Sequence, residues 1–244
     1  MRCPCDTIHL WPEILLIKPS LQGMVWLRLV VPVTIGDAVD PTAPVFFLSY
    51  AHSPPRVGSG DHDRTIVKFF NDLSENVAEL VSIAPGSSLG FMDRSMEVGV
   101  NWTQQLLTAV GTCRVFVAML SPRYFRSSWC SQEWFAFSQR RVANSEHGGS
   151  AIVPVIWAPF PEEQIPNAAR KVQRFSPHDI REPGVGQLYE SEGVFGLMQM
   201  DTNAYQIVVW RLAQTIARLS FTVRVEPNVL NENKLRDILA ERSP

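Results

Sequence analysis

The sequence predicts a single α/β domain in which an open parallel sheet is covered by helices on both faces. From residue 45 onward, short apolar runs alternate with amphipathic segments, a pattern typical of βαβ units. The run at 114–120 is almost continuously apolar, as expected for a strand buried on both sides of a parallel sheet. A chain of 244 residues is long enough for one such domain with an extension.

The first half of the domain contains two predicted strand-helix pairs, with strands at 45–49 and 88–92. Asp61 or Asp63 is suited to begin the first helix, because an aspartate side chain accepts hydrogen bonds from the first turn. A loop at 93–101 precedes the second helix. Apolar residues at helical spacing mark the two buried faces: Ile66, Phe70, Leu73, Val77 and Leu80 in the first helix, and Trp102, Leu106 and Val110 in the second.

The second half starts with the central strand at 114–120 and continues with a fourth strand at 151–157. Ser121-Pro122 is predicted to open a helix between them, since proline is tolerated in a first turn, and this helix should run to a stop near Gly148. Residues 159–196 predict loops, a short helix and an edge strand. Asn203 is expected to cap a last helix whose buried face is Tyr205, Val208, Leu212, Ile216 and Leu219.

Three regions follow from these patterns. Residues 1–43 are rich in proline, lack a stable period and end in a proline-bounded linker, so we expect a poorly ordered N-terminal extension. Residues 44–222 form the domain. Residues 223–244 form a C-terminal tail, in which 229–240 predict a short amphipathic helix.

Composition excludes several function classes. Lys and Arg total 22 against 24 Asp and Glu, and a net charge of -2 gives no field that would attract nucleic acid or an anionic membrane. No apolar run reaches the roughly 20 residues of a spanning helix. Four cysteines without a scaffold pattern, and no secretory signal, favour a cytoplasmic protein. The five histidines lack metal-ligand spacing, so no metal is expected, and without a Gly-x-Gly-x-x-Gly motif no bound dinucleotide cofactor is expected.

Four segments in register resemble the TIR domains of immune receptors and bacterial effectors, over about residues 45–220. They are FFLSY at 46–50, GFMD at 90–93, RVFVAMLSP at 114–122, and a Tyr-x-x-Ser-x-Trp-Cys-x-x-Glu pattern from Tyr124 to Glu133. This resemblance implies the flavodoxin-like TIR fold. The phrases FLSYAH, GFMDR and SPRYFRS are closer to the bacterial FxsC type of TIR-like protein, found with genes for short peptides that end in an FxSxx pattern.

Glu133 is the candidate catalytic residue. It lies four residues after Trp129 and therefore one helical turn away on the same face. In TIR enzymes that cleave NAD, the resemblance implies that a glutamate at this position contacts the ribose and stabilises positive charge as nicotinamide leaves. From the residues alone a second interpretation stays open, in which Glu133 is a solvated helical glutamate beside a core tryptophan.

The candidate substrate-binding residues are Trp129, as an aromatic wall beside Glu133, and five residues from two other places. Ser49 and Tyr50 end the first strand, at the edge where open α/β sheets bind ligands. Asp93, Glu97 and Trp102 lie in or after the loop where the resemblance implies a flexible lid. Each of the five also has a plain structural interpretation, as a turn, surface or core residue. The loop after the first strand holds a single cation, Arg56, although some NAD-cleaving relatives carry basic residues there.

Three functions therefore stay open at the level of sequence. The first is a signalling or effector protein that hydrolyses NAD, as substrate, at the nicotinamide-ribose bond. The second is a non-catalytic module that associates with other TIR domains through the loop at 93–99. The third, suggested by the FxsC resemblance, is an accessory protein of FxSxx peptide maturation.

Overall fold

The computed structural model describes residues 43–52, 63–83, 86–93, 104–144, 150–177 and 184–239, all within one compact unit, 38–244. Four parallel strands form its main sheet in the order β2-β1-β3-β5. The predicted parallel α/β sheet is confirmed. The strands are β1 (Phe46–Ser49), β2 (Gly90–Met92), β3 (Val115–Leu120) and β5 (Ile152–Ile156).

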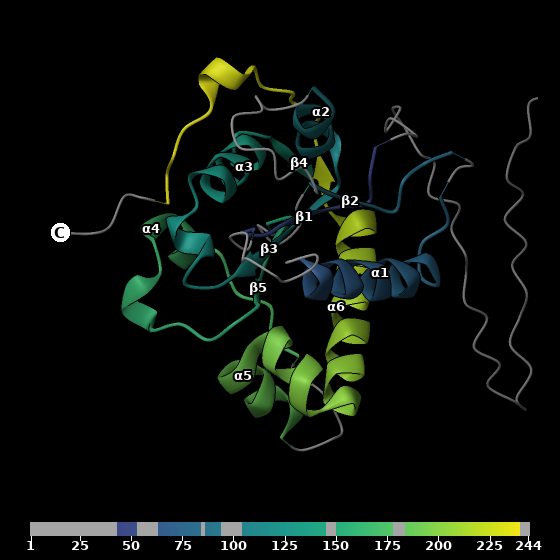
Figure 1. Ribbon diagram of the computed structural model, residues 1–244. Helices are drawn as coiled ribbons and strands as arrows, with labels where there is room; N and C mark the ends of the chain where they lie inside the picture. The colour runs from purple at the N-terminus through teal and green to yellow at the C-terminus, as the bar shows by residue number, and fades with distance from the viewer. Residues whose placement is uncertain are drawn as a thin grey trace, which may run out of the picture. The chain divides into compact units, whose positions relative to one another are not determined.

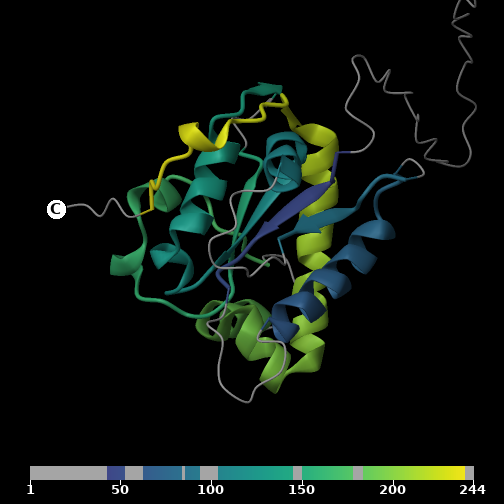
Figure 2. The ribbon, with the colours of Figure 1, turned by 45° about the horizontal axis from the view of Figure 1, so that its top comes forward.

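Helices cover both faces of this sheet, as predicted (Figure 1). The helices α1 (Arg64–Ala78) and α6 (Thr202–Thr222) pack together on one face, and α2 (Gln104–Thr112) and α3 (Ser128–Ser138) pack on the other (Figure 2). Every residue of β1 and β3 is buried, because each of these strands has a strand on both sides and a helix layer on both faces.

Aromatic rings fill the core between β1, β3 and α3. Phe116 stacks on Phe47 at a ring-centroid distance of 5.6 Å and on Phe137 at 5.3 Å. Trp134 meets the same ring edge-on at 6.2 Å. Such ring pairs add to the area that they bury. They fix α3 against the centre of the sheet, and with it the inward-facing side chains of α3.

The strand order defines where a ligand is expected. The chain runs from β1 to β2 on one side of β1, and then crosses to β3 on the other side. The direction of winding therefore changes between β1 and β3. In open parallel sheets, ligands bind outside the carboxyl ends of the strands at such a switch point.

The helix predicted to open at Ser121-Pro122 differs from α3, and its predicted bounds were wrong. A 3₁₀ turn, η1 (Tyr124–Arg126), comes first, and α3 begins after Ser127, whose hydroxyl accepts a hydrogen bond from the Cys130 backbone N–H at 3.2 Å. The helix ends at Ser138 and does not reach Gly148. It is followed by β4 (Val142–Asn144), which pairs with the distant β6 (Arg224–Val225).

The segment 159–196 is more helical than predicted. It contains η2 (Glu162–Gln164), α4 (Asn167–Arg170) and most of α5 (Val185–Met200), and no edge strand among its described residues. The helix α5 bends at Gly193, where φ is 64°. A Cβ atom at Gly193 would lie 2.7 Å from the Trp157 carbonyl oxygen, so the close approach of two backbones requires glycine there.

Two further details of the helices differ from the prediction. In α1 the buried residues are Ile66, Phe69, Leu73 and Val77, whereas Phe70 and Leu80 are half-buried. In α6 the cap is Asp201, not Asn203, since the Asp201 carboxylate accepts a hydrogen bond from the Ala204 N–H at 2.9 Å. The predicted buried face of α6 is confirmed: Tyr205, Val208, Leu212, Ile216 and Leu219.

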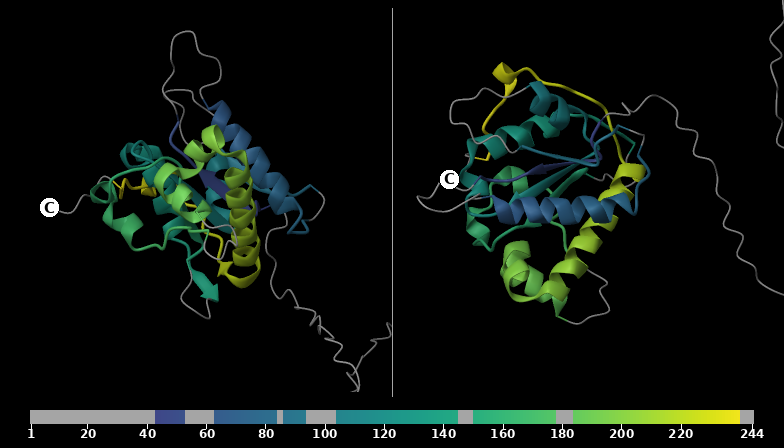
Figure 3. Two further views of the ribbon diagram at one scale, coloured as in Figure 1. Left: turned by 90° about the horizontal axis from the view of Figure 1, so that it is seen from below. Right: turned by 45° about the vertical axis from the view of Figure 1, so that its right-hand side comes forward.

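The C-terminal segment crosses the side of the sheet that carries α2 and α3 (Figure 3). Up to residue 239 it contains β6 and one 3₁₀ turn, η3 (Glu232–Lys234), in place of the predicted amphipathic helix. Leu239 is buried, and its backbone N–H donates to the Ser131 hydroxyl at 2.7 Å. Within the part of the chain that the structure describes, no helix is long and apolar enough to cross a membrane. The predicted N-terminal extension, up to residue 42, lies outside that part.

Candidate active site

Three buried polar side chains meet at the switch point of the sheet. Ser49 ends β1, Tyr124 lies in η1 just after β3, and Glu133 projects from α3. The Ser49 hydroxyl donates a hydrogen bond to Glu133 Oε2, and Ser49 Oγ lies 2.9 Å from the Tyr124 hydroxyl oxygen. The sequence thus brings together one residue from each of three elements that are distant along the chain.

Burial controls the charge of Glu133, whose exposed fraction is 2%. Loss of water raises the pKa of Glu133 to about 8, and the negative charge of Asp93 at the end of β2 acts in the same direction. The hydrogen bond from Ser49 and the neighbouring Trp129 indole lower the pKa but do not offset the burial. The neutral carboxyl is therefore favoured at neutral pH.

Within the part of the chain that the structure describes, no basic side chain is paired with this carboxyl. Among the described groups that shift the pKa of Glu133, none is basic. An ionised carboxylate that is removed from water without a cation is costly, so the group keeps its proton instead. A cationic ligand at this position would supply the missing charge.

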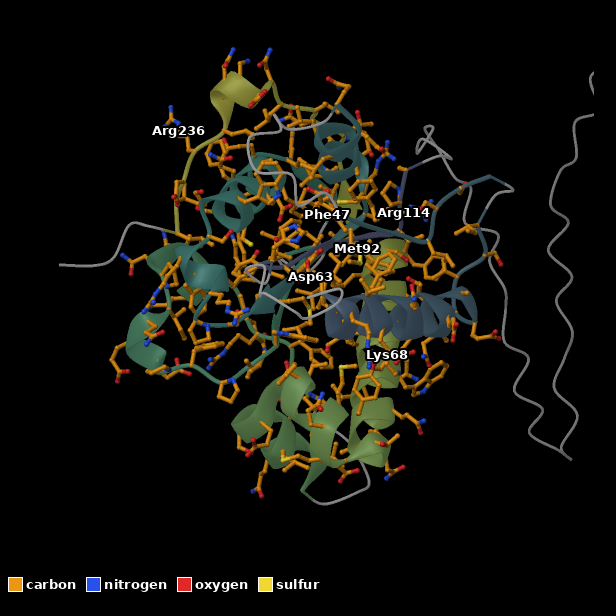
Figure 4. The ribbon with its side chains drawn as sticks, viewed as in Figure 1. Phe47, Asp63, Lys68, Met92, Arg114 and Arg236 are labelled. Atoms are coloured by element: carbon orange, nitrogen blue, oxygen red, sulfur yellow. The ribbon has the colours of Figure 1, made fainter. Side chains whose placement is uncertain are left out.

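A second polar cluster surrounds the end of β1. The Tyr50 hydroxyl donates to the Asp93 backbone oxygen at 2.8 Å and to Asp63 Oδ2 at 3.3 Å. His52 Nδ1 lies 2.8 Å from the same Asp63 oxygen, and the rings of Tyr50 and His52 are 4.5 Å apart. Asp63 sits at the start of α1, beside the sheet (Figure 4).

The sequence-based site residues fall into three groups. Ser49 and Trp129 both lie next to Glu133. Tyr50 and Asp93 are joined in the neighbouring cluster, and the charge of Asp93 reaches Glu133. Glu97 and Trp102 lie outside the described residues, as does Arg56. The assignment of all these residues to catalysis or substrate binding stays a prediction.

Sequence reasoning missed His52 and Tyr124. The histidines were tested only for metal-ligand spacing, and Asp63 was interpreted as a helix cap. A usable signal was present, because His52 follows the end of β1 by three residues and belongs to the same carboxyl edge as Ser49. Across the described ranges, no group of three or more His, Cys, Asp or Glu residues is arranged to hold a metal ion.

A family model and a solved structure are similar to this chain. A family model described as TIR domain matches residues 46–189. Among solved structures, the chain is similar to one from the activated Roq1 resistosome directly recognising the pathogen effector XopQ, in its TIR domains. That pair is 19% identical over 73% of this chain and 84% of the other, with a TM-score of 0.30. No curated protein matches the chain.

The two ends of the family match coincide with described elements. It begins at the first residue of β1 and ends within α5, so it includes all four strands of the sheet and the site around Glu133. It spans more than half of the 244 residues, and the chain therefore belongs to the TIR domain family.

Proposed function

We propose that the chain is a bacterial, cytoplasmic TIR signalling protein that hydrolyses NAD at the nicotinamide-ribose bond, with Glu133 as its catalytic residue. One observation carries the proposal. The Glu133 carboxyl is buried at the switch point of the sheet, held by the Ser49 hydroxyl, with no basic group among the described residues that shift its pKa. Family membership supports a role in signalling.

The charge of NAD fits this site. The nicotinamide ring of NAD is a pyridinium cation, so its arrival would favour the ionised form of Glu133. Binding of the cation and loss of the proton from Glu133 are then coupled, because the cation stabilises the carboxylate that burial destabilises. A neutral ligand of the same shape would lack this contribution.

The same carboxylate is suited to the bond-breaking step. As the bond between ribose C1′ and the pyridinium nitrogen breaks, its electron pair moves to nicotinamide, which leaves as a neutral molecule. Positive charge then lies on C1′ and the ring oxygen of the ribose, and water adds to C1′ to give ADP-ribose. A carboxylate fixed beside this charge in a water-poor site stabilises the transition state by a few kcal/mol, or about a hundredfold or more in rate.

The test is the release of nicotinamide from NAD by purified protein, measured by liquid chromatography. Glu133→Gln keeps the shape of the side chain and removes the charge, so turnover should fall at least about a hundredfold while the circular dichroism spectrum is unchanged. Glu163→Gln, at an exposed glutamate of η2, is the matched control and should be fully active. Cleavage that persists in Glu133→Gln refutes the assignment.

Self-association is a second candidate function that a specific surface favours. A groove of about 670 Å³ runs between α1 and α6, and Trp210 is one of the residues that line it. The exposed fraction of Trp210 is 38%, and that of Phe221, eleven residues further along α6, is 68%. Exposed aromatic residues at helical spacing favour a protein partner, and we propose a second copy of this domain.

Light scattering of Trp210→Glu against wild type tests the self-association. A concentration-dependent dimer that disappears in the variant supports it, and a wild type that is monomeric at all concentrations contradicts it. If the wild type assembles but cleaves no NAD at any concentration, the chain is an interaction module. The FxsC resemblance further leads us to propose that the chain is an accessory protein of FxSxx peptide maturation. This proposal predicts that the chain binds an FxSxx precursor in a pull-down.

A further inference from the structure

Asp63 breaks a local rule of helix formation. It occupies the N-cap position of α1, where an aspartate ordinarily accepts hydrogen bonds from the first turn. Its side chain makes no such bond. Its Oδ2 atom accepts from Tyr50 and lies 2.8 Å from His52 Nδ1 instead. A residue that departs from its local preference in this way marks a position where another function has priority.

The contact with Asp63 selects the tautomer of a neutral His52 ring. A carboxylate oxygen at 2.8 Å is an acceptor, so the neutral imidazole carries its proton on Nδ1. The other nitrogen, Nε2, then has the lone pair and is able to take up a proton. The side chains of His52 and Asp63 are 19% and 10% exposed, so both are largely shielded from water.

We propose that His52 is a general base that activates the attacking water in NAD hydrolysis, with Asp63 as its positioning residue; this inference rests on the proposed function. His52 follows Ser49, the hydrogen-bond donor to Glu133, by three residues at the end of β1. Tyr50 connects the two groups, because it contacts Asp63 and His52 and lies within electrostatic range of Glu133. The carboxyl edge of β1 thus carries a charge-stabilising carboxylate and a separate base, linked through Tyr50.

The proposed step balances in atoms and charge. After nicotinamide has left with the electron pair of the broken bond, a water oxygen forms a bond to ribose C1′. The water proton passes to His52 Nε2, and the resulting imidazolium is stabilised by the Asp63 carboxylate. The proton then leaves to solvent. A positioned general base of this kind contributes about a hundredfold or more in rate.

The test separates hydrolysis from base exchange. A pyridine base such as 3-acetylpyridine attacks C1′ through its own lone pair and has no proton to lose, so exchange does not need His52. We expect His52→Gln to lower hydrolysis about a hundredfold and to leave exchange with 3-acetylpyridine within about threefold of wild type. Glu133→Gln should lower both reactions, because both pass through the same bond breakage.

Variants of Asp63 separate the positioning role from a structural one. Asp63→Ser supplies a good N-cap residue but no carboxylate, so it should keep the melting temperature while lowering hydrolysis relative to exchange. Asp72→Asn is the matched control. Asp72 lies nine residues further along α1 and accepts a hydrogen bond from the Tyr205 hydroxyl at 2.6 Å, just as Asp63 accepts from Tyr50. It should leave the ratio of hydrolysis to exchange unchanged.

The outcomes separate the two proposals. If wild type cleaves NAD, and if His52→Gln and Asp63→Ser shift the ratio towards exchange, both proposals are supported. If cleavage depends on Glu133 but the His52 and Asp63 variants keep the wild-type ratio of hydrolysis to exchange, His52 is not the general base. The proposed function is then unaffected. A wild type that performs neither reaction at any protein concentration overturns both.

Discussion

Two buried ionisable side chains near α3, Glu133 and Arg140, differ in how their charge is satisfied. They lie seven residues apart, and their exposed fractions are 2% and 6%. Arg140 is surrounded by acceptors that the fold supplies. Glu133 accepts a hydrogen bond from the Ser49 hydroxyl and has a nearby negative charge. The charge of Arg140 is satisfied by acceptors of the fold, whereas no described basic group balances the charge of Glu133.

Arg140 joins two segments that are distant in the sequence, the end of α2 and the C-terminal segment. Its guanidinium donates to the backbone oxygens of Cys113 at 2.6 Å and Val110 at 3.1 Å, at the C-terminal end of α2. It also donates to the oxygens of Glu226 at 3.1 Å and Val225 at 3.4 Å in the C-terminal segment. The negative end of the helix dipole favours a cation there. This charge therefore holds the fold together.

The difference shows how to separate structural from functional charges in one molecule. A buried group whose hydrogen bonds and charge are both satisfied by the protein has a structural role. Glu133 is hydrogen-bonded, but none of the described groups around it supplies a balancing positive charge, which costs stability whenever it ionises. A cost of this kind, placed at the switch point of the sheet, supports the proposal that Glu133 binds a ligand.

The largest expected effect concerns Arg140. In Arg140→Met, several buried carbonyl groups lose their donor, so the free energy of unfolding should fall by about 3 to 5 kcal/mol. Urea denaturation measures it. The adjacent and exposed Arg141 offers the control, since Arg141→Met should change stability by less than about 0.5 kcal/mol. Equal effects at the two positions would mean that Arg140 is not a structural charge.

The next effect is the pH dependence that Glu133 imposes on stability. Its pKa of about 8 in the folded protein exceeds the ordinary value of 4.5, so unfolding releases a proton between these limits. The stabilisation is complete below the lower value and is lost as pH rises to the upper one, at ~1.4 kcal/mol per pH unit. Wild type should therefore lose about 3 kcal/mol between about pH 5.5 and pH 8 relative to Glu133→Gln.

The other ionisable groups facing Glu133 are Asp93 from the end of β2, Tyr50 after β1, Tyr124 from η1 and Cys130 from α3. Burial raises the pKa of the two tyrosines and of the thiol, which keeps them out of this range. Urea denaturation at three pH values, with Glu163→Gln as the control that keeps the wild-type slope, measures the contribution of Glu133. Parallel pH profiles for wild type and Glu133→Gln would contradict it.

Ser49→Ala sharpens the comparison further. The Ser49 hydroxyl stabilises the ionised form of Glu133, so its removal should raise the pKa of Glu133 by about one unit. The loss of stability with pH should then extend to correspondingly higher pH. The same urea series, continued to about pH 9.5, detects this shift. An unchanged midpoint would show that the hydroxyl does not act on the carboxyl.

Tyr124→Phe should give the smallest effect. Its hydroxyl contacts Ser49 and not Glu133, so the free energy of unfolding should fall by about 1 kcal/mol or less. The pH midpoint of Glu133 should stay close to that of wild type. A midpoint that moves as far as in Ser49→Ala would mean that the three side chains act as one hydrogen-bonded unit.

The sequence predicts the sheet well because its information is local. The run at 114–120 needs no distant contact to be recognised as a buried strand, and β3 lies there. The helix α5 could not be found in this way. Its bend at Gly193 depends on the backbone of Trp157, and Phe195 N–H donates to the Trp157 oxygen at 2.9 Å. From the local sequence, the glycines of α5 predict a loop.

The site was predictable in part for the same reason. Glu133 and Trp129 are one turn apart on one helix, so their proximity follows from spacing, and Ser49 follows from its place at a strand end. The Asp63–His52 contact joins a loop to a helix. The preference of aspartate for helix N-caps predicted that Asp63 caps α1, but in the folded protein its side chain contacts His52 instead.

Titration of the Glu133 carboxyl by carbon NMR tests the central claim most directly. The glutamate carboxyl carbons are labelled with ¹³C, and Glu133→Gln assigns the signal. In the free protein the pKa should be about 8. With carba-NAD, an uncleavable analogue that keeps the pyridinium charge, the pKa should fall below about 7, because the cation stabilises the carboxylate. A pKa near the ordinary 4.5 in the free protein, or no response to the analogue, would contradict the account.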